Sequence, residues 1–248
     1  MEITVNGVKT NYLSFGEGKP FIILHGWGSG SDRWIKEAEI ISAKGFLVII
    51  PDLPGFGASD KLSRPWTVND YVKWLEDFTN ELNIDTFYLL GHSFGGALAA
   101  KMAIKYPQRV QKLFLAAAAV IRKKTTQKNL SAKMSKAVKI FSFLPGYDFF
   151  RKAVYKFIIR KSDYIYTEGI MKETYLNVIS DDVSFKLSFI KVPTVIIWGD
   201  KDQSTPIEDA KLVNDKIRNS KLVIIPGADH LMHKLIPEIL AEKVLENI

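Results

Sequence analysis

The stretch Phe87-Tyr-Leu-Leu-Gly-His-Ser-Phe-Gly-Gly-Ala97 carries the strongest structural signal in the sequence. Its first four residues are apolar, as in a buried strand, and the alanine-rich sequence from Ala97 onward is typical of a helix. Between them, a serine stands in a tight turn whose flanking glycines avoid steric clashes. This arrangement predicts that the Ser93 hydroxyl lies at a helix N-terminus, where N–H groups and the helix dipole stabilise negative charge.

The same alternation of strand and helix continues on both sides of this stretch. Buried strands are expected at residues 21–24, 46–50, 87–90, 113–117, 194–198 and 222–225. Helices are expected at residues 31–43, 67–82, 93–106, 206–217 and 231–246. The pattern predicts an α/β fold with a mostly parallel central sheet and helices on both faces. An antiparallel hairpin of residues 3–8 and 10–14, turning near Asn6-Gly7, is expected at the sheet edge.

The composition is that of an ordinary globular protein. Of 248 residues, 47% are hydrophobic and 25% charged, which excludes a disordered chain, a collagen-like repeat and a coiled coil. The absence of cysteine excludes disulfides, thiolate catalysis and iron–sulfur clusters. The N-terminus lacks the pattern of a secretory signal, and the longest apolar run, residues 113–121, is far shorter than the roughly 20 residues of a membrane span. We expect a cytoplasmic protein without a transmembrane segment.

The net charge of +7 comes from one internal segment. Residues 122–186 hold 14 basic and 6 acidic side chains, whereas the remainder of the chain has a net charge of −1. Two amphipathic helices are predicted on either side of Pro145-Gly146, with lysines opposite apolar faces. Because this segment contains no expected strand, it is predicted to be a helical insertion into a core formed by residues 1–121 and 187–248.

The basic face of this insertion is interpreted as solvated surface, with the apolar faces packed on the rest of the protein. Peripheral contact with an anionic membrane surface, or with an anionic substrate, is the alternative. No nucleic acid partner is expected, because no recognised nucleic-acid-binding module accompanies the charge.

A serine hydroxyl becomes a good nucleophile only when a base takes its proton, and the sequence has four histidines. His25 directly follows a strand and His92 precedes the serine, positions that favour structural roles. His230 follows the strand at residues 222–225 and a Pro-Gly turn, on a loop at the carboxyl end of a strand. His233 is one helical turn further along and is expected to point elsewhere. His230 is therefore the predicted base.

The base needs a carboxylate to orient it, and that carboxylate should also follow a strand. Asp202 lies far enough beyond the strand at residues 194–198 to turn back toward the sheet edge, whereas Asp200 is placed to stabilise the turn. Asp229 adjoins His230 in sequence and is badly placed to bond its ring. The end of the strand at residues 113–117 is the other possible location of the acid, but residues 116–120 hold no carboxylate. Asp202 is the predicted acid.

The order Ser93, Asp202, His230 resembles that of the α/β-hydrolase superfamily. His25-Gly-Trp-Gly28 is similar to the oxyanion loop of that family, which implies that the backbone N–H groups of Trp27 and Phe94 form an oxyanion hole. Residues 52–59 resemble the family's loop after the fourth strand, and the insertion at residues 122–186 stands where members carry a cap. The resemblance covers nearly the whole chain.

The residues also narrow the reaction within this resemblance. Ser93 argues against haloalkane dehalogenases and epoxide hydrolases, which carry aspartate at that position, and the sequence after His230 lacks the tryptophan of carbon–carbon hydrolases. The remaining expectation is hydrolysis of small, hydrophobic carboxylic esters through an acyl-enzyme, without metal or organic cofactor. The alternatives are a carbon–carbon hydrolase, a lactonase or a perhydrolase on the same triad, or a non-enzymatic ligand-binding homologue.

Overall fold

The computed structural model describes residues 1–122 and 167–248. The two amphipathic helices predicted around Pro145-Gly146 lie outside the described residues. The last part of the predicted insertion is described and contains the helix α6 (Gly169–Ser180) and the start of the short 3₁₀ helix η3 (Ser184–Phe189), which crosses the predicted boundary at residue 186.

The described residues form one eight-stranded sheet in the order β1-β2-β4-β3-β5-β6-β7-β8. Its strands are β1 (Glu2–Val5), β2 (Val8–Phe15), β3 (Lys19–Leu24), β4 (Phe46–Pro51), β5 (Phe87–His92), β6 (Val110–Ala116), β7 (Thr194–Gly199) and β8 (Ser220–Ile225). The β1–β2 and β2–β4 pairs are antiparallel, and the other pairs are parallel. The predicted mostly parallel α/β sheet is confirmed.

The edge hairpin is confirmed, with a correction to its boundary. Val8, expected at the end of the first strand, begins β2 and pairs with Val5. The turn consists of Asn6 and Gly7, whose φ angles of 49° and 79° both lie in the left-handed region. Two such residues form the type of turn that matches the twist of a two-residue hairpin.

Five helices lie beside the sheet where the sequence predicts helices. They are α1 (Ile35–Ser42), α2 (Val68–Glu81), α3 (Phe94–Lys105), α7 (Ile207–Lys216) and α9 (Pro237–Leu245). Thr67 caps α2 in a capping box with Asp70, as its sequence indicates. None of the helices among the described residues combines the length and apolarity that a bilayer crossing requires.

Two predicted helices differ from the structure. The helix expected at residues 31–43 begins as the 3₁₀ helix η1 (Ser31–Trp34) before α1. The helix expected at residues 231–246 is wrong as a single element, because it consists of α8 (Met232–Leu235) and α9. Pro237 has no N–H and clashes with the preceding turn, so one helix ends before it and the next begins at it.

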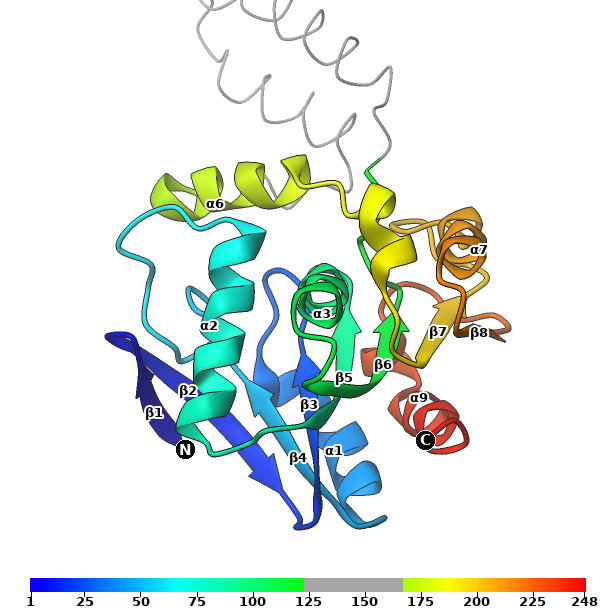
Figure 1. Ribbon diagram of the computed structural model, residues 1–248, viewed down its shortest axis with the longest axis horizontal. Coiled ribbons are helices and arrows are strands. Elements are labelled where there is room, and N and C mark those ends of the chain that lie inside the picture. The colour runs from blue at the N-terminus through cyan, green and yellow to red at the C-terminus, as the bar shows by residue number, and fades with distance from the viewer. Residues whose placement is uncertain (123–166) are drawn as a thin grey trace, which may run out of the picture.

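The direction of the strand order reverses between β3 and β5. From β3 the chain moves to β4 on one side, and from β4 it crosses back to β5 on the other side. Right-handed crossovers then place α1 on one face and α2 with α3 on the opposite face. The carboxyl ends of the strands at such a reversal are where ligands bind in open α/β sheets. In Figure 1, β5 and β6 point toward the side of the molecule where α6 lies.

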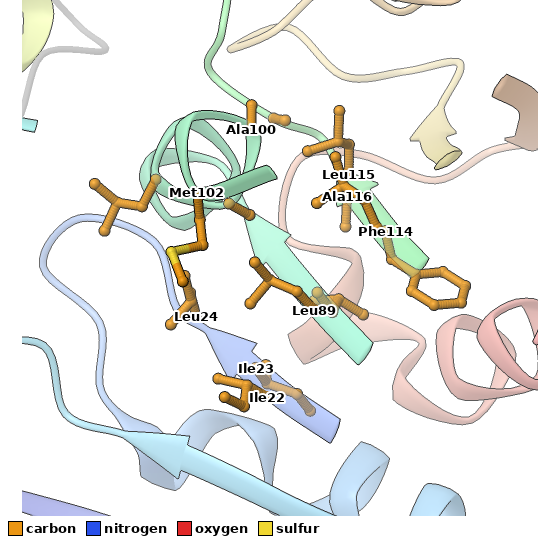
Figure 2. Close-up of a cluster of buried hydrophobic side chains, with 14 of the residues drawn as sticks. Ile22, Ile23, Leu24, Leu89, Ala100, Met102, Phe114, Leu115 and Ala116 are labelled. Carbon is orange, nitrogen blue, oxygen red and sulfur yellow. The ribbon is translucent and has the colours of Figure 1, made fainter. Parts of the chain in front are cut away.

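The core is formed by the central strands and the helix α3. Figure 2 shows Ile22, Ile23 and Leu24 of β3, Leu89 of β5 and Phe114 of β6 in one cluster of buried side chains, with Met102 from α3. Because these strands are covered on both faces, their sequences are continuous apolar runs. Each fully buried side chain of this size contributes about 1.5–3 kcal/mol, so the strands form a rigid support for the loops at their ends.

The helix α6 is fastened to the core by polar contacts. The backbone N–H of Trp66 donates to Thr174 Oγ1 at 3.1 Å, and the Asn177 amide donates to the Trp66 carbonyl at 3.3 Å. Lys101 of α3 forms an ion pair with Asp181, just after the helix. These contacts hold α6 above α2 and α3 (Figure 1).

Candidate active site

Ser93 occupies the turn between β5 and α3. Its φ of 51° lies in the left-handed region, which costs a residue with a side chain of order 1–3 kcal/mol. The turn is held by hydrogen bonds from the Ser93 N–H to Ala116 and from the Ala119 N–H to the Ser93 carbonyl, at 3.1 and 2.9 Å. A Cβ on Gly95 would lie 2.2 Å from the Leu24 carbonyl oxygen, so only glycine permits this close approach. The strained turn predicted from the sequence is confirmed.

The structure brings the side chains of Ser93, His230 and Asp202 together. The Nε2 atom of His230 lies 3.0 Å from Ser93 Oγ, and its Nδ1 atom lies 2.8 Å from Asp202 Oδ2. The Asp202 side chain is fully buried, whereas 18% of the His230 side chain is exposed. One imidazole is thus connected at both nitrogens, in the arrangement that lets a base accept the hydroxyl proton while a carboxylate orients it.

Asp202 receives four hydrogen bonds. Its Oδ1 accepts from the N–H groups of Ser204 and Thr205 at 2.7 and 2.9 Å, and its Oδ2 accepts from the Thr205 hydroxyl at 2.7 Å as well as from His230. Burial alone would raise the pKa of Asp202, but the hydrogen bonds from His230 and Thr205 outweigh it and lower the pKa. The carboxylate therefore stays ionised. Thr205 was not identified from the sequence, because no motif distinguishes it.

The other candidate acids make separate contacts. Asp200 accepts from the Gly227 N–H at 2.7 Å and so fastens the turn after β8, consistent with the expected turn role. Asp229 accepts from the Leu231 N–H at 2.7 Å. Each of these carboxylates caps a backbone turn, so Asp202 is the only carboxylate within the described residues that is hydrogen bonded to His230.

Two other histidines are held in fixed positions by the core. His25 accepts from the Leu53 N–H at Nε2, 3.0 Å away, so its Nδ1–H donates to the Gly26 carbonyl at 2.8 Å. Burial lowers the pKa of His25 and keeps the ring neutral. His233 stacks on Trp34 with 4.9 Å between ring centroids, and burial lowers its pKa to about 4. His233 thus points into the core rather than toward Ser93, as the sequence predicts.

The loop of residues 52–59 is fastened by one carboxylate. Asp52 accepts from the Ser31 N–H at 2.6 Å and from the Ala58 N–H and the Asn11 amide, each at 2.9 Å. Burial would raise the pKa of Asp52, but these hydrogen bonds outweigh it and lower the pKa. A Cβ on Gly57 would lie 2.3 Å from the Asp52 carboxyl carbon, so this position needs glycine.

The two expected oxyanion donors are Trp27, on the loop after β3, and Phe94, directly after Ser93. Phe94 is the first residue of α3, and its N–H has no acceptor within the helix. The Trp27 N–H makes no hydrogen bond to any residue that the structure describes. The Trp27 ring lies against the rings of Phe56, Phe94 and Tyr175, with centroids 4.8, 5.4 and 5.1 Å away. These rings form an aromatic wall beside the nucleophile turn.

The sequence matches the model of one protein family, described as the alpha/beta hydrolase fold, over residues 19–160. This match covers more than half of the chain. The chain belongs to the α/β-hydrolase family. The family assignment agrees with the sheet order, the strained serine turn and the order of Ser93, Asp202 and His230 along the chain.

The relatives of this hydrolase include proteins named as lipases and a protein named as a dienoic acid hydrolase. It is 30% identical to the AB hydrolase superfamily protein YisY of Bacillus subtilis, covering 87% of this chain and 86% of the relative. It is 26% identical to Lipase 1 of Psychrobacter immobilis, covering 91% and 76%. The crystal structure of a meta-cleavage product hydrolase from Pseudomonas fluorescens superposes with a TM-score of 0.74 at 22% identity, covering 99% and 96%. At 22% identity, this structural similarity shows a shared fold and no more.

Proposed function

We propose that this protein is a serine hydrolase that cleaves carboxylic esters through an acyl-enzyme. The observation that carries the proposal is the single imidazole of His230, which lies 3.0 Å from the Ser93 hydroxyl and 2.8 Å from the Asp202 carboxylate. In this proposal Ser93 is the nucleophile, His230 the general base and acid, and Asp202 the group that orients the imidazole and stabilises its charged form.

The chemistry follows from these positions. Ser93 Oγ attacks the ester carbonyl carbon while its proton passes to His230 Nε2. The negative oxygen that forms accepts hydrogen bonds from the N–H groups of Trp27 and Phe94. His230 then protonates the leaving alkoxide, which departs as the alcohol and leaves an acyl group on Ser93. Water attacks this acyl group as His230 takes its proton. His230 then returns the proton to Ser93 Oγ as the acyl–oxygen bond breaks, which regenerates the serine and releases the carboxylic acid.

The surroundings of Ser93 favour small, hydrophobic esters as substrates. Trp27 and Tyr175 are the partly exposed members of the aromatic wall and present apolar surface beside the nucleophile, while the buried rings of Phe56 and Phe94 pack against Trp27. We propose that residues 122–186 form a cap over this site, since α6 already lies above α2 and α3 (Figure 1). The similarity to Lipase 1 of Psychrobacter immobilis supports an ester substrate.

Covalent labelling tests the nucleophile. Incubation with a fluorophosphonate followed by intact-mass measurement should add one phosphonyl group to the wild type and none to Ser93→Ala. Ester turnover should fall far more than tenfold in Ser93→Ala, a factor that corresponds to about 1.4 kcal/mol of barrier. Labelling of Ser93→Ala, or its turnover within tenfold of wild type, contradicts the proposal. Labelling without turnover of any ester would favour the ligand-binding alternative.

The two aspartates after β7 provide a matched pair for testing the acid. Asp202→Asn should lower kcat by about 10³–10⁴, because an amide can hold the imidazole in the wrong tautomer. Asp200→Asn removes a carboxylate from the same loop and should leave kcat within a few-fold. Both are to be compared on one ester at temperatures well below their melting points. Equal losses would mean that Asp202 does not act on His230.

A further inference from the structure

His92 lies where the nucleophile turn meets two other loops of the site. Its side chain precedes Ser93 and is buried, with 3% of its surface exposed. Its Nε2 atom lies 2.8 Å from the carbonyl oxygen of His230, a residue 138 positions away in the sequence. Its Nδ1 atom would lie 3.1 Å from a Cβ on Gly26, so the ring also touches the loop that carries Trp27.

The hydrogen bonding of His92 defines its tautomer. A carbonyl oxygen can only accept, so Nε2 carries the proton and donates it to His230. Burial, followed by the neighbouring His233 and His230 rings, holds the pKa of His92 well below its usual value. The ring is therefore neutral, with one donor directed at the backbone of the predicted base. Its Nδ1 atom has no hydrogen-bond partner among the described residues.

Two aromatic rings pack against His92. The centroids of the His233 and Trp34 rings lie 4.4 and 5.8 Å from that of His92, and Trp34 stacks on His233 with an interplanar angle of 9°. Trp34 is fully buried and His233 is nearly so. Because protein cores are close-packed, these two rings leave the His92 ring little freedom to tilt away from the His230 carbonyl.

We infer that His92 is a positioning residue, which holds the backbone of His230 so that its imidazole reaches Ser93 and Asp202 at once. His230 lies on the loop between β8 and α8, outside any regular element. The two imidazole contacts must form simultaneously, and a misplacement of about 1 Å in such a site can cost about 10²-fold in rate. This inference rests on the proposed function, because it assigns His230 the role of base.

The inference can be tested with substitutions at position 92 that remove the N–H donor but keep the volume of the side chain, or keep both. In His92→Gln, the amide nitrogen can take the place of Nε2 and keep the donor. In His92→Leu, the volume is similar and the donor is lost. Asn at this position has a donor that is too short to reach, so His92→Asn is a second donor-deficient variant if the leucine variant does not fold.

The readouts are kcat, KM and the rate at which a fluorophosphonate labels Ser93, in variants that melt above the assay temperature. We expect kcat and the labelling rate to fall about 10- to 100-fold in His92→Leu and His92→Asn, with KM within threefold. His92→Gln should recover most of both rates. A side chain that only fills space would instead give comparable rates in the leucine and glutamine variants.

The result that overturns the inference is a donor-deficient variant with kcat within threefold of wild type, or a glutamine variant as slow as the leucine variant. Failure of the proposed function looks different. In that case the wild type itself would show neither Ser93-dependent labelling nor ester turnover, whatever residue stands at position 92.

Discussion

At the scale of single residues, the hydroxyl of Thr205 donates to the same carboxylate oxygen of Asp202 that faces His230. It also lies 3.3 Å from His230 Nδ1 and 3.3 Å from the Ala117 carbonyl. The Thr205 side chain is buried, so no bulk solvent replaces it. Hydrogen bonds to a charged group contribute about 1.5–3 kcal/mol, roughly twice as much as those between neutral groups. The Thr205 hydroxyl therefore fixes Oδ2 of the carboxylate, whereas the backbone N–H groups of Ser204 and Thr205 fix Oδ1.

Replacing this hydroxyl should weaken the predicted triad. Thr205→Val keeps the shape of the side chain but removes a donor to Asp202, and we expect kcat/KM to fall at least tenfold, about 1.4 kcal/mol. Thr205→Ser keeps the hydroxyl and should stay within threefold of wild type. Steady-state kinetics on one ester, with melting temperatures as a check on folding, compare the three proteins. A valine variant as active as the serine variant would show that the hydroxyl is dispensable.

At the scale of secondary structure elements, the packing of α1 against α9 buries a carboxyl group. Glu37 of α1 is 1% exposed, and its two oxygens have no hydrogen-bond partner among the described residues. Burial, together with a smaller contribution from the nearby Glu238 of α9, raises the pKa of Glu37 from 4.5 to about 8. The folded protein thus keeps a proton at neutral pH that the unfolded chain has released.

This difference in protonation makes stability depend on pH in a defined direction. Between about pH 4.5 and 8 the folded state binds more protons at Glu37 than the unfolded state, so the free energy of unfolding falls as pH rises. Each unit of pKa difference corresponds to about 1.4 kcal/mol. Glu37→Gln should remove this decline. The free energy of unfolding of the variant, relative to that of the wild type, should therefore rise from pH 5 to pH 8.

Urea unfolding at pH 5, 6.5 and 8 measures the effect. Glu39→Gln on the same helix is the matched control, because the Glu39 side chain is 54% exposed. We expect the control to follow the pH dependence of the wild type. Parallel pH profiles for wild type and Glu37→Gln would show that Glu37 titrates normally in the folded protein.

At the scale of the whole molecule, the excess positive charge belongs to residues 122–186 and not to the sheet that carries the site. Solvated lysines outside a pocket are screened within about 10 Å at 0.1 M salt. Replacing Lys133, Lys136 and Lys139 together by Gln should therefore leave kcat/KM for a neutral short-chain ester within a few-fold. Phe141→Ala or Phe157→Ala should change it more, by altering the predicted apolar face of the cap.

Neutral and anionic esters at low and high salt distinguish this expectation from the alternative role of the basic face. Recruitment of an anionic substrate predicts a large loss in the triple Gln variant that is confined to anionic esters and disappears at high salt. Recruitment to a membrane predicts the same salt-dependent loss on anionic vesicles only. Either result would overturn the interpretation of these lysines as solvated surface.

The sequence by itself determined the features that depend on neighbouring residues. Strands that are buried on both faces need continuous apolar sequences, so apolar runs such as residues 87–90 predict them. The glycines around Ser93 permit its strained turn. Asp202 and His230 each follow the carboxyl end of a parallel strand, so the sequence also predicted that they lie at the same edge of the sheet. The single helix predicted at residues 231–246 is wrong, because Pro237 interrupts helical hydrogen bonding within a stretch whose apolar periodicity is otherwise helical.

Only the tertiary structure decided which side chains contact the triad residues and hold them in position. The contact of His92 with the His230 carbonyl, the stack of Trp34 on His233 and the hydroxyl of Thr205 on Asp202 follow no spacing along the chain. The burial of Glu37 likewise depends on where α9 packs, far from α1 in sequence. Periodicity reports which face of an element is buried, whereas the partner that a buried polar atom meets is set by the packing of distant loops and helices.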